Sequence, residues 1–443
     1  MAAQEFDLFL TPIHESLNGD EYVIATYLVG APQEADIISR VTAIALEQTT
    51  GTWSRVPGET ETVRHRSAGR VVAIYSVPDY ESKGPIPADT GPRWYVARIA
   101  FPWINFYDNL PLLLSTVIGN ISAMDNLKLL DLDLPRSYVA QFKGPKFGLE
   151  GVRELTHVSS RPLLNNMIKP CTGIDPEAGA DLFYGAAAGG TDWIKDDELL
   201  SGSPSFSPLT ARVKAYMAAA AKADKEKGEV TLYSVNITDE HPRLLENALR
   251  AIEAGANAVM LNVYATGFSG LRTLAEDPRV TVPITVHNCF SGAMVGNPFG
   301  GFSSVVGAKL ARLAGADIYL DYVPTMKFGG IQEKFLRIIH TCLSPAYDLK
   351  PTMPHIGGGV TPGLVPYLMG KTGSDVAIGA GGGIHAHPAG PKAGARAMRQ
   401  AIEATMNRVP LAEFAKEKKE LAQALELWGE FGSEKMKSLF ALS

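Results

Sequence analysis

From about residue 162 onward the chain alternates short apolar strands with amphipathic helices, and this repeat limits the available folds more than any other feature. Eight successive strand ends lie 25 to 41 residues apart, which leaves room for one crossover helix in each interval. Eight such units in roughly 240 residues fit a (β/α)₈ barrel. The alternative, an open doubly wound sheet, would not need so many consecutive strand–helix units. The predicted strands lie in residues 163–170, 191–197, 231–238, 258–263, 284–288, 317–323, 352–358 and 375–383.

The N-terminal part lacks this regular repeat. Three segments rich in β-branched and aromatic residues predict strands, and helical patterns lie between and after them. One of these helices is expected to end at Thr50, and another covers Leu112 to Ile118. We therefore expect an α/β protein with an N-terminal α+β domain (1–150), followed by a TIM barrel with a C-terminal helical tail (151–443). The three strand segments are 21–29, 69–77 and 93–101.

Charge and apolar patterning exclude several classes of protein. The chain has 41 Lys+Arg against 47 Asp+Glu, a net charge of −6, and no basic block suited to nucleic acid. It contains no apolar run of roughly 18 residues and no signal-peptide pattern at its start, so we expect neither membrane insertion nor secretion. The three cysteines, Cys171, Cys289 and Cys342, form no disulfide or metal-clamp pattern. A cytoplasmic location is the simplest expectation.

The second barrel strand ends in the run Lys195-Asp196-Asp197-Glu198. In such barrels the active site lies at the carboxyl ends of the strands, and two carboxylates there suit Mg²⁺. Alternation along the strand places Lys195 and Asp197 on one side. Taken alone, the run is also typical of a solvated loop. A partly buried Lys195 can lose its proton and add CO₂, and the resulting carbamate would be a third oxygen ligand.

Two glycine triplets follow the seventh and eighth strands, 357–359 and 381–383. Loops at these two positions usually bind phosphate in TIM barrels, because glycine lets backbone N–H groups approach the anion. Plain tight turns are the alternative. The pair His385 and His387 could suggest a metal site, but turn residues are the preferred interpretation. Three further polar residues complete a ring around the predicted barrel mouth: Lys169, His287 and Lys327.

These residues together resemble a known family. The segment GGTDWIKDDE (189–198) is similar to the metal-site signature of the RuBisCO large-chain superfamily, and the likeness extends over nearly the whole chain. The resemblance implies an α+β domain followed by a barrel, and a homodimer, or a higher oligomer, in which the N-terminal domain completes the partner's active site. The other matching segments are EQTTGTW (47–53), GN (119–120), IKP (168–170), VH (286–287), Lys327 and HPAGPKAGARA (387–397).

By position, the resemblance also assigns roles. Lys195 would be a lysine carbamylated by CO₂, and Asp197 and Glu198 would complete the Mg²⁺ ligands. Lys169 matches an acid/base lysine, and His287 a residue that contacts substrate. Glu47 and Asn120 would reach the neighbouring subunit's site. The residues implied in substrate and phosphate binding are Thr52, Trp53, Lys327, Gly358, Gly359, Gly381 and Gly382.

The departures from the carboxylase pattern concern the second phosphate site. Asn288 stands where the carboxylase has Arg, Leu320 where it has His, and Gly357 where it has Ser; Cys171 replaces a second Lys. Each lost charge-assisted hydrogen bond is worth about 1.5 to 3 kcal/mol. We therefore expect a RuBisCO-like protein that acts on a sugar monophosphate rather than on a bisphosphate.

The expected chemistry is Mg²⁺-dependent formation of an enolate. Decarboxylation or C–C cleavage of 3-oxo-isoapionate 4-phosphate is the first expectation, so the enzyme would be a lyase. The alternative is 2,3-diketo-5-methylthiopentyl-1-phosphate enolase of methionine salvage, placed second because Asn120 and Lys169 are carboxylase-type residues. Ribulose-bisphosphate carboxylation and a non-catalytic structural dimer are less favoured.

Overall fold

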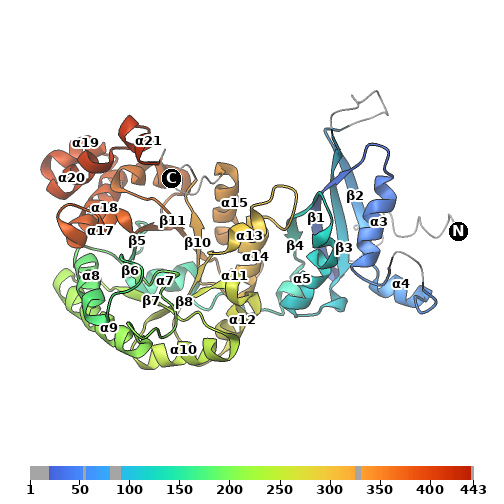
Figure 1. The fold of residues 1–443 in the computed structure, drawn as a ribbon, viewed down its shortest axis with the longest axis horizontal. Helices are drawn as coiled ribbons and strands as arrows, with labels where there is room; N and C mark the ends of the chain where they lie inside the picture. The colour runs from blue at the N-terminus through green and yellow to red at the C-terminus, as the bar shows by residue number, and fades with distance from the viewer. Residues whose placement is uncertain (1–18, 53–55, 80–90, 325–330, 441–443) are drawn as a thin grey trace. The chain divides into compact units, whose positions relative to one another are not determined.

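The chain divides into two compact units, each described separately below (Figure 1). One comprises residues 1–142 and 290–310, and the other comprises 143–289 and 311–443. The structure is a computed structural model that describes residues 19–52, 56–79, 91–324 and 331–440. The domain boundary expected at residue 150 remains a prediction.

The N-terminal unit is built on an antiparallel sheet with strand order β2-β3-β1-β4. Buried and less buried residues alternate over much of β1, as expected for a strand with one face against a core. The three predicted strands are present. The strands are β1 (Tyr22–Ala31), β2 (Arg70–Val77), β3 (Arg93–Pro102) and β4 (Leu127–Asp133); the helices are α3 (Ile37–Glu47), α4 (Glu61–Ser67), α5 (Leu110–Ile118) and α6 (Arg136–Val139).

Helix α3 ends three residues before the predicted Thr50. Its start is fixed by Asp36, whose carboxylate accepts hydrogen bonds from the backbone N–H groups of Ile38 and Ser39. At its other end the Gln48 side-chain amide donates to the carbonyl oxygens of Ser115 (3.0 Å) and Thr116 (2.7 Å) on α5. The end of α3 is therefore tied to the end of α5.

Residues 290–310 belong to the N-terminal unit although they follow the fifth barrel strand in sequence. The backbone N–H of Leu129 on β4 donates to Gly301 (2.9 Å), and that of Ser303 donates to Leu129 (2.8 Å). Lys128 also donates from Nζ to the Val295 carbonyl (2.8 Å). Neither β4 nor this pairing was expected from the sequence. The segment contains α13 (Ser291–Val295) and the start of α14 (Ser304–Ala314).

In the second unit, the described residues form a closed barrel of eight parallel strands, in the order β10-β11-β12-β5-β6-β7-β8-β9. The predicted TIM barrel is confirmed, and the open-sheet alternative is wrong. Each predicted strand segment contains one strand. The strands are β5 (Leu163–Met167), β6 (Trp193–Lys195), β7 (Leu232–Asn236), β8 (Ala258–Asn262), β9 (Ile284–His287), β10 (Ile318–Tyr322), β11 (Met353–Gly357) and β12 (Ala377–Ala380).

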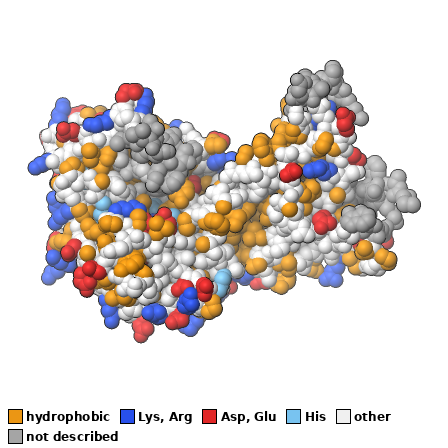
Figure 2. Space-filling view, in the orientation of Figure 1, with side chains coloured by type: hydrophobic (Ala, Val, Ile, Leu, Met, Phe, Trp, Pro, Cys, Tyr) orange, Lys and Arg blue, Asp and Glu red, His pale blue; other side chains and the backbone are white. Residues whose placement is uncertain are grey.

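Amphipathic helices surround this barrel (Figure 1), and a C-terminal helical tail follows, as expected. No helix among the described residues is long and apolar enough to cross a membrane. Acidic and basic side chains are interspersed over the visible face of the barrel unit (Figure 2). The helices are α7 (Gly148–Thr156), α8 (Pro176–Ala188), α9 (Leu209–Lys227), α10 (His241–Glu253), α11 (Val263–Thr266), α12 (Phe268–Glu276), α15 (Gln332–Leu343), α16 (Val365–Thr372), α17 (Gly382–His385), α18 (Gly390–Met406), α19 (Leu411–Phe414), α20 (Lys419–Trp428) and α21 (Glu434–Phe440).

The amino-terminal end of the barrel interior is an apolar layer. It is formed by the first residues of six strands together with Leu149 and Val152 of α7. Packing of this kind makes the barrel interior a solid core rather than a pore, so chemistry is confined to the ends. The six strand residues are Leu163, Trp193, Leu232, Ile318, Met353 and Ala377.

The next layer towards the carboxyl ends is polar. The Trp193 indole N–H donates to Ser234 (2.7 Å), whose hydroxyl lies 3.0 Å from that of Thr285. His355 is fully buried with its ring centroid 4.6 Å from that of Trp193. Its imidazole occupies the space that a side chain at Gly379 would need. Glycine is therefore required at 379 as long as histidine stands at 355.

Candidate active site

Lys195, the last residue of β6, is fully buried in the barrel. Its Nζ donates one hydrogen bond, to the carbonyl oxygen of Asp196 at 3.0 Å. Burial lowers the pKa of Lys195, although the nearby carboxylates of Glu198 and Asp197 oppose that shift. A lysine with a lowered pKa is more often the neutral amine, the form that reacts with CO₂.

Asp196, in the middle of the Lys-Asp-Asp-Glu run, makes structural contacts and does not face the barrel mouth. Its fully buried carboxylate lies 3.2 Å from Arg212 Nε and accepts hydrogen bonds from Tyr233 Oη (2.8 Å) and the Asn236 backbone N–H (3.0 Å). Strand alternation explains this split, because Asp196 must face away from the side shared by Lys195 and Asp197. These contacts fix the strand end that carries its two neighbours.

Asp197 is joined to Lys169, which follows β5. Nζ of Lys169 lies 2.5 Å from Oδ2 of Asp197 and 2.8 Å from Sγ of Cys171. Burial raises the pKa of Asp197, but the hydrogen bond and charge of Lys169 outweigh it, so the pKa is lowered. Burial in turn lowers the pKa of Lys169, but its hydrogen bonds to Asp197 and Cys171 outweigh it, so this pKa is raised. The pair is therefore ionic at neutral pH.

Glu198 lies beside His287, the last residue of β9, with 3.5 Å between Oε2 and Nε2. The Nδ1 atom of His287 accepts a hydrogen bond from the Cys289 backbone N–H at 3.0 Å. In a neutral imidazole the proton must then reside on Nε2, facing Glu198. Burial, with the charge of Lys195, lowers the pKa of His287 well below its usual value. His287 is therefore a neutral hydrogen-bond donor.

Both glycine triplets lie at the carboxyl ends of strands, as predicted. Gly357 ends β11, and Gly358 and Gly359 have φ values of +96° and +82°, which favour glycine. A Cβ at Gly381 would lie 3.3 Å from Cε of Lys169, whereas one at Gly382 would meet nothing within 4 Å. The second turn therefore packs against Lys169 and also leaves an open face of backbone at Gly382.

The carboxylase pattern would place a second phosphate beside positions 288, 320 and 357, and none of these three residues is a cation here. Asn288 is 3% exposed and donates to Asp321, with 3.4 Å between Nδ2 and Oδ1, and Leu320 is also buried. Burial raises the pKa of Asp321 to about 7. Asp321, which no signal in the sequence marked, is half-buried and is an acidic group, so it supplies no positive charge here.

The predicted residues of the N-terminal unit can be placed only within that unit. Glu47 and Asn120 lie at the ends of α3 and α5 that Gln48 ties together, and both are exposed. Thr52 is exposed as well. Two other predicted phosphate-binding residues, Trp53 and Lys327, lie outside the described residues.

The two histidines of the GGIHAHP segment do not form a metal pair. His385 Nε2 lies 3.1 Å from Asn166 Oδ1, whereas His387 Nε2 lies 3.0 Å from the Glu420 carbonyl oxygen on α20. His385 thus connects the turn after β12 to β5. The preferred interpretation, that they follow the turn and are not a metal pair, agrees with these contacts.

The carboxylates at the mouth suit a hard cation but are too few to hold one by themselves. In the part of the chain that the structure describes, no group of three or more His, Cys, Asp or Glu side chains could hold a metal ion. Asp197 and Glu198 supply oxygen donors, which Mg²⁺ prefers. A carbamate on Lys195 would add the third protein oxygen, so the donor set fits Mg²⁺ only with that modification.

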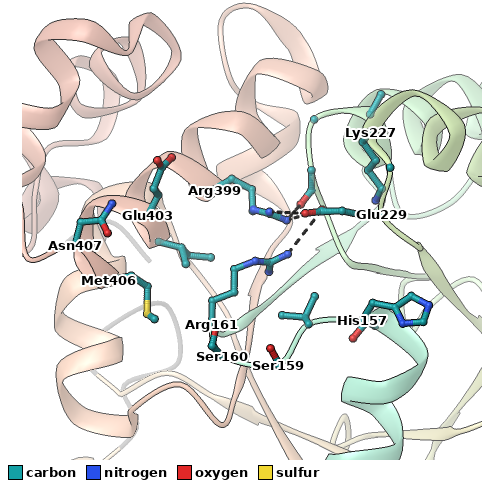
Figure 3. Close-up of a pocket in the computed structure, with 17 residues that line it drawn as sticks. His157, Ser159, Ser160, Arg161, Lys227, Glu229, Arg399, Glu403, Met406 and Asn407 are labelled. Atoms are coloured by element: carbon teal, nitrogen blue, oxygen red, sulfur yellow. Dashed lines mark hydrogen bonds and ion pairs between the residues drawn. The ribbon is translucent and has the colours of Figure 1, made fainter.

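A pocket of about 710 Å³ lies at the opposite, amino-terminal end of the barrel (Figure 3). It is distant from the chemistry described above, because it is lined by the loops that precede β5, β6 and β7 and by α18. Arg161 and Arg399 both point towards Glu229, with nearest N···O distances of 3.7 and 3.0 Å. Arg161 and Arg399 therefore both pair with Glu229.

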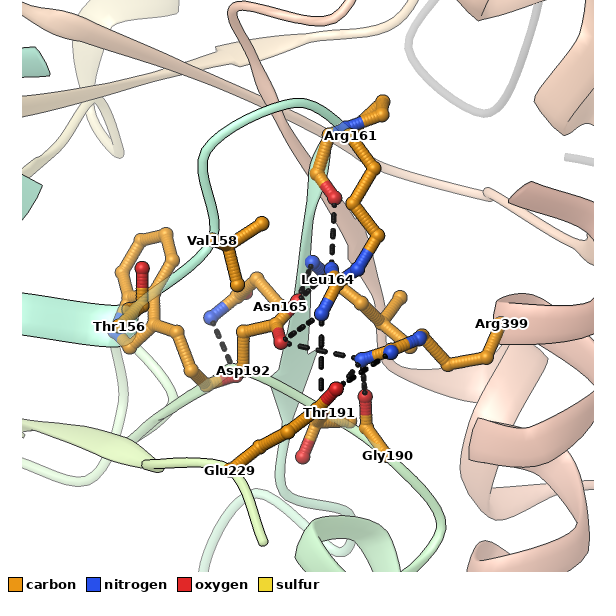
Figure 4. A network of polar contacts seen from close by, with 12 residues as sticks. Thr156, Val158, Arg161, Leu164, Asn165, Gly190, Thr191, Asp192, Glu229 and Arg399 are labelled. Atoms are coloured by element: carbon orange, nitrogen blue, oxygen red, sulfur yellow. Dashed lines mark hydrogen bonds and ion pairs between the residues drawn. The ribbon is translucent and has the colours of Figure 1, made fainter. Parts of the chain in front are cut away.

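Asp192 is the centre of this pairing (Figure 4). Its fully buried carboxylate accepts two hydrogen bonds of 2.6 Å from Arg161, one of 3.2 Å from Arg399 and one of 2.8 Å from the Leu164 backbone N–H. A buried carboxylate whose charge is compensated by two arginines is typical of a network that stabilises the fold. This pocket is thus not the candidate active site.

Comparison with known families agrees with this geometry. The catalytic-domain family of the ribulose bisphosphate carboxylase large chain matches residues 148–428, and the N-terminal-domain family matches residues 14–138. The chain belongs to the RuBisCO large-chain family. The resemblance inferred from the sequence is confirmed.

Several relatives cover nearly the whole chain. A ribulose bisphosphate carboxylase-like protein from Archaeoglobus fulgidus is 48% identical over 93% of this chain and 95% of its own length. A 2,3-diketo-5-methylthiopentyl-1-phosphate enolase from Geobacillus kaustophilus is 37% identical, covering 92% of this chain and 98% of its own.

Solved structures give the same result. A RuBisCO-like protein (MtnW) from Alicyclobacillus acidocaldarius has a TM-score of 0.83 at 36% identity, covering 92% of this chain and 100% of its own. The octameric RuBisCO of Pyrococcus horikoshii has a TM-score of 0.84 at 32% identity, with coverages of 95% and 96%.

Proposed function

We propose that this protein is an enzyme that enolises a keto-sugar monophosphate with the help of Mg²⁺, and that its substrate is 2,3-diketo-5-methylthiopentyl 1-phosphate or a close analogue. One observation carries the proposal. Lys169, Asp197, Glu198 and His287 lie at the carboxyl ends of β5, β6 and β9 and are joined in pairs by contacts of 2.5 and 3.5 Å. A proton-transfer lysine thus stands beside two oxygen ligands.

The RuBisCO family uses Mg²⁺ and a carbamylated lysine, and the residues present here fit both. Asp197, Glu198 and carbamylated Lys195 would hold the ion. Bound there, Mg²⁺ supplies a Lewis acid that stabilises negative charge on an oxygen next to the carbon that loses its proton. The buried amine of Lys195, with its lowered pKa, supports carbamylation.

The chain's own residues account for the other steps. Lys169 moves the proton at the substrate carbon, since its amine is an acid/base group that lies 2.5 Å from the Asp197 carboxylate. His287 donates a hydrogen bond from Nε2–H, which orients a substrate oxygen next to Glu198. The open backbone at Gly381 and Gly382 binds the phosphate, together with Gly358 and Gly359 of the neighbouring turn.

The substrate class follows from the two unlike sides of the mouth. One side has the glycine turn and Lys169, whereas the other has Asn288, Leu320 and Gly357 and no cation among the described residues. A substrate with one phosphate and an uncharged end fits this asymmetry. The relatives favour the methionine-salvage enolase, which was the alternative expectation, and give no support to 3-oxo-isoapionate 4-phosphate.

A substrate panel tests the proposal. The protein, incubated with Mg²⁺ and bicarbonate, is assayed for enol absorbance with 2,3-diketo-5-methylthiopentyl 1-phosphate, for CO₂ release with 3-oxo-isoapionate 4-phosphate, and for labelled CO₂ incorporation with ribulose bisphosphate. We expect the first signal alone. CO₂ release without enol absorbance would replace the enolase with a decarboxylase, and activity that survives both chelation and CO₂ removal would contradict the metal site.

We also propose a homodimer with a shared active site, which the resemblance implies and the exposure of Glu47 and Asn120 supports. Mixing inactive Asn120→Ala chains with inactive Lys195→Ala chains should restore part of the activity, because a hybrid dimer would contain one intact site. Mass spectrometry of the intact complexes checks that hybrids form. Hybrids that form without any activity would contradict the shared site.

A further inference from the structure

The amine of Lys169 has two side-chain partners of different chemistry among the described residues. The carboxylate of Asp197 lies at 2.5 Å and the sulfur of Cys171 at 2.8 Å. The lysine stem also packs over the turn after β12, where a Cβ at Gly381 would come within 3.3 Å of Cε. The two hydrogen bonds fix the position of the amine, and the turn after β12 limits the space of the lysine stem.

The two partners differ in what else they must do. If the proposed function holds, Asp197 is a metal ligand, and an oxygen that binds a cation is a weaker acceptor for the Lys169 ammonium. Cys171 is not among the proposed metal ligands, and it is only partly buried. Its sulfur is a weak acceptor that brings no positive charge. It is therefore the partner that can keep its contact with Lys169 in the active enzyme.

We propose that Cys171 is a positioning residue that holds the Lys169 amine in place for proton transfer. This inference rests on the proposed function, because it assigns Lys169 the proton transfer. A second lysine at position 171, as in the carboxylase pattern, would place two ammonium groups in contact. The thiol instead accepts a hydrogen bond from Lys169 and leaves it as the single cation of the pair.

Kinetics of three variants test the role. Cys171→Ala should lower kcat about five- to tenfold with KM within twofold of the wild type, because the amine is misplaced while substrate binding is kept. Cys171→Ser, which retains an acceptor, should restore kcat to within threefold. Cys342→Ala is the matched control, a thiol of the same unit on helix α15 rather than at a strand end, and should leave both constants unchanged. An unchanged kcat in Cys171→Ala, or no rescue by serine, would overturn the proposal.

A second measurement needs neither substrate nor metal. Burial raises the pKa of Cys289 to about 11 and that of Cys342 to about 12, so iodoacetamide should alkylate Cys171 first. The sulfur of Cys171 lies 2.8 Å from the Lys169 amine, so loss of that amine changes the surroundings of the reacting atom. Lys169→Met should therefore change the alkylation rate of Cys171 at least threefold, and Lys214→Met, on the exposed side of α9, should not.

The two tests fail separately. An unchanged alkylation rate in Lys169→Met would show that the contact does not exist in solution and would overturn the inference. If alkylation depends on Lys169 but no substrate of the panel is enolised, the proposed function fails while the contact stands. Peptide mapping by mass spectrometry identifies the alkylated residue in each case.

Discussion

Two lysines lie at opposite ends of the barrel, Lys195 fully buried and Lys227 with 9% of its side chain exposed, and burial lowers the pKa of both. Lys227, at the amino-terminal end, donates to the Thr191 carbonyl (2.6 Å) and the Thr231 hydroxyl (2.7 Å) and lies 3.8 Å from Asp224. Lys195, at the carboxyl end, donates one hydrogen bond among the described residues, to the carbonyl oxygen of Asp196, the next residue in the chain. The same residue type is thus fully partnered at one end and underpartnered at the other.

This difference in pairing indicates that charged residues at the amino-terminal end stabilise the fold, whereas those at the carboxyl end take part in the chemistry. Around Asp192 every charge is paired, so removing one partner leaves another buried and uncompensated. At the mouth, the fully buried Lys195 and the half-buried Asp321 each lack an ion pair within 4 Å in the described residues. Groups that are costly to bury and poorly compensated are typical of functional sites. We expect substitutions at the two ends to affect different properties.

The largest effect is expected from exchanging the two lysines for methionine. Lys195→Met should lower activity more than 10³-fold, which corresponds to about 4 kcal/mol, and should leave stability unchanged or higher because a costly buried amine is removed. Lys227→Met should keep activity within twofold and lose about 1 to 3 kcal/mol of stability, since its partners become unpaired. Turnover assays and urea unfolding measure both. An active Lys195→Met protein would contradict the proposed difference in role between the two ends of the barrel.

Asp192→Asn is expected to destabilise the fold by about 3 kcal/mol, because Arg161 loses its buried counter-charge. Activity per folded molecule should stay within twofold. Glu403→Gln is the control, an exposed carboxylate on the same pocket, and should change stability by less than about 0.5 kcal/mol. Equal unfolding free energies for the two variants would show that the network is not structural.

Ribulose bisphosphate should bind at least 100-fold more weakly than the monophosphate substrate. A second phosphate brings about −1.5 to −2 charge to the side with Asn288 and Asp321, and an uncompensated charge there costs several kcal/mol. Titration calorimetry with Mg²⁺ and bicarbonate gives both affinities. Asn288→Arg should narrow the gap, and tight binding with CO₂ incorporation in the wild type would refute the assignment.

The smallest effect concerns pH. Burial lowers the pKa of His385 to about 4, below its value of roughly 6.5 in the unfolded chain. As pH falls below 6.5 the unfolded state binds the proton first, so the folded state loses stability. His385→Gln should remove about 1 kcal/mol of the loss between pH 6.5 and 5.5. Urea midpoints of the two proteins at each pH measure the difference, and parallel curves would contradict it.

The barrel was predictable because its evidence is local. Each strand is a short apolar run and each helix a periodic one, so the order of elements determined the fold class. The strand β4 was missed because only pairing with β1, about 100 residues earlier, makes it part of a sheet. Residues 290–310 were assigned to the barrel for the same reason, since their partner is β4 and not a sequence neighbour.

The candidate site was predictable where strand ends carried a recognisable pattern. Lys169, Asp197, Glu198 and His287 were named from the sequence and lie together in the structure. Asp321 was not named, because its role depends on burial beside Asn288, and burial of one carboxyl leaves no pattern in the sequence. The contact between Lys169 and Cys171 was not predicted either, because the sequence showed only that cysteine replaces a lysine of the carboxylase pattern.

The packing of His355 onto Gly379 has a consequence for how such a barrel can change over time. Any side chain at 379 collides with the imidazole. Substitutions at positions 355 and 379 can therefore be fixed in only one order. The histidine must first give way to a smaller residue, and a side chain can enter at 379 only afterwards. Lineages that carry a bulky residue at 379 should therefore descend from ancestors that had already lost His355, which ancestral sequence reconstruction can verify.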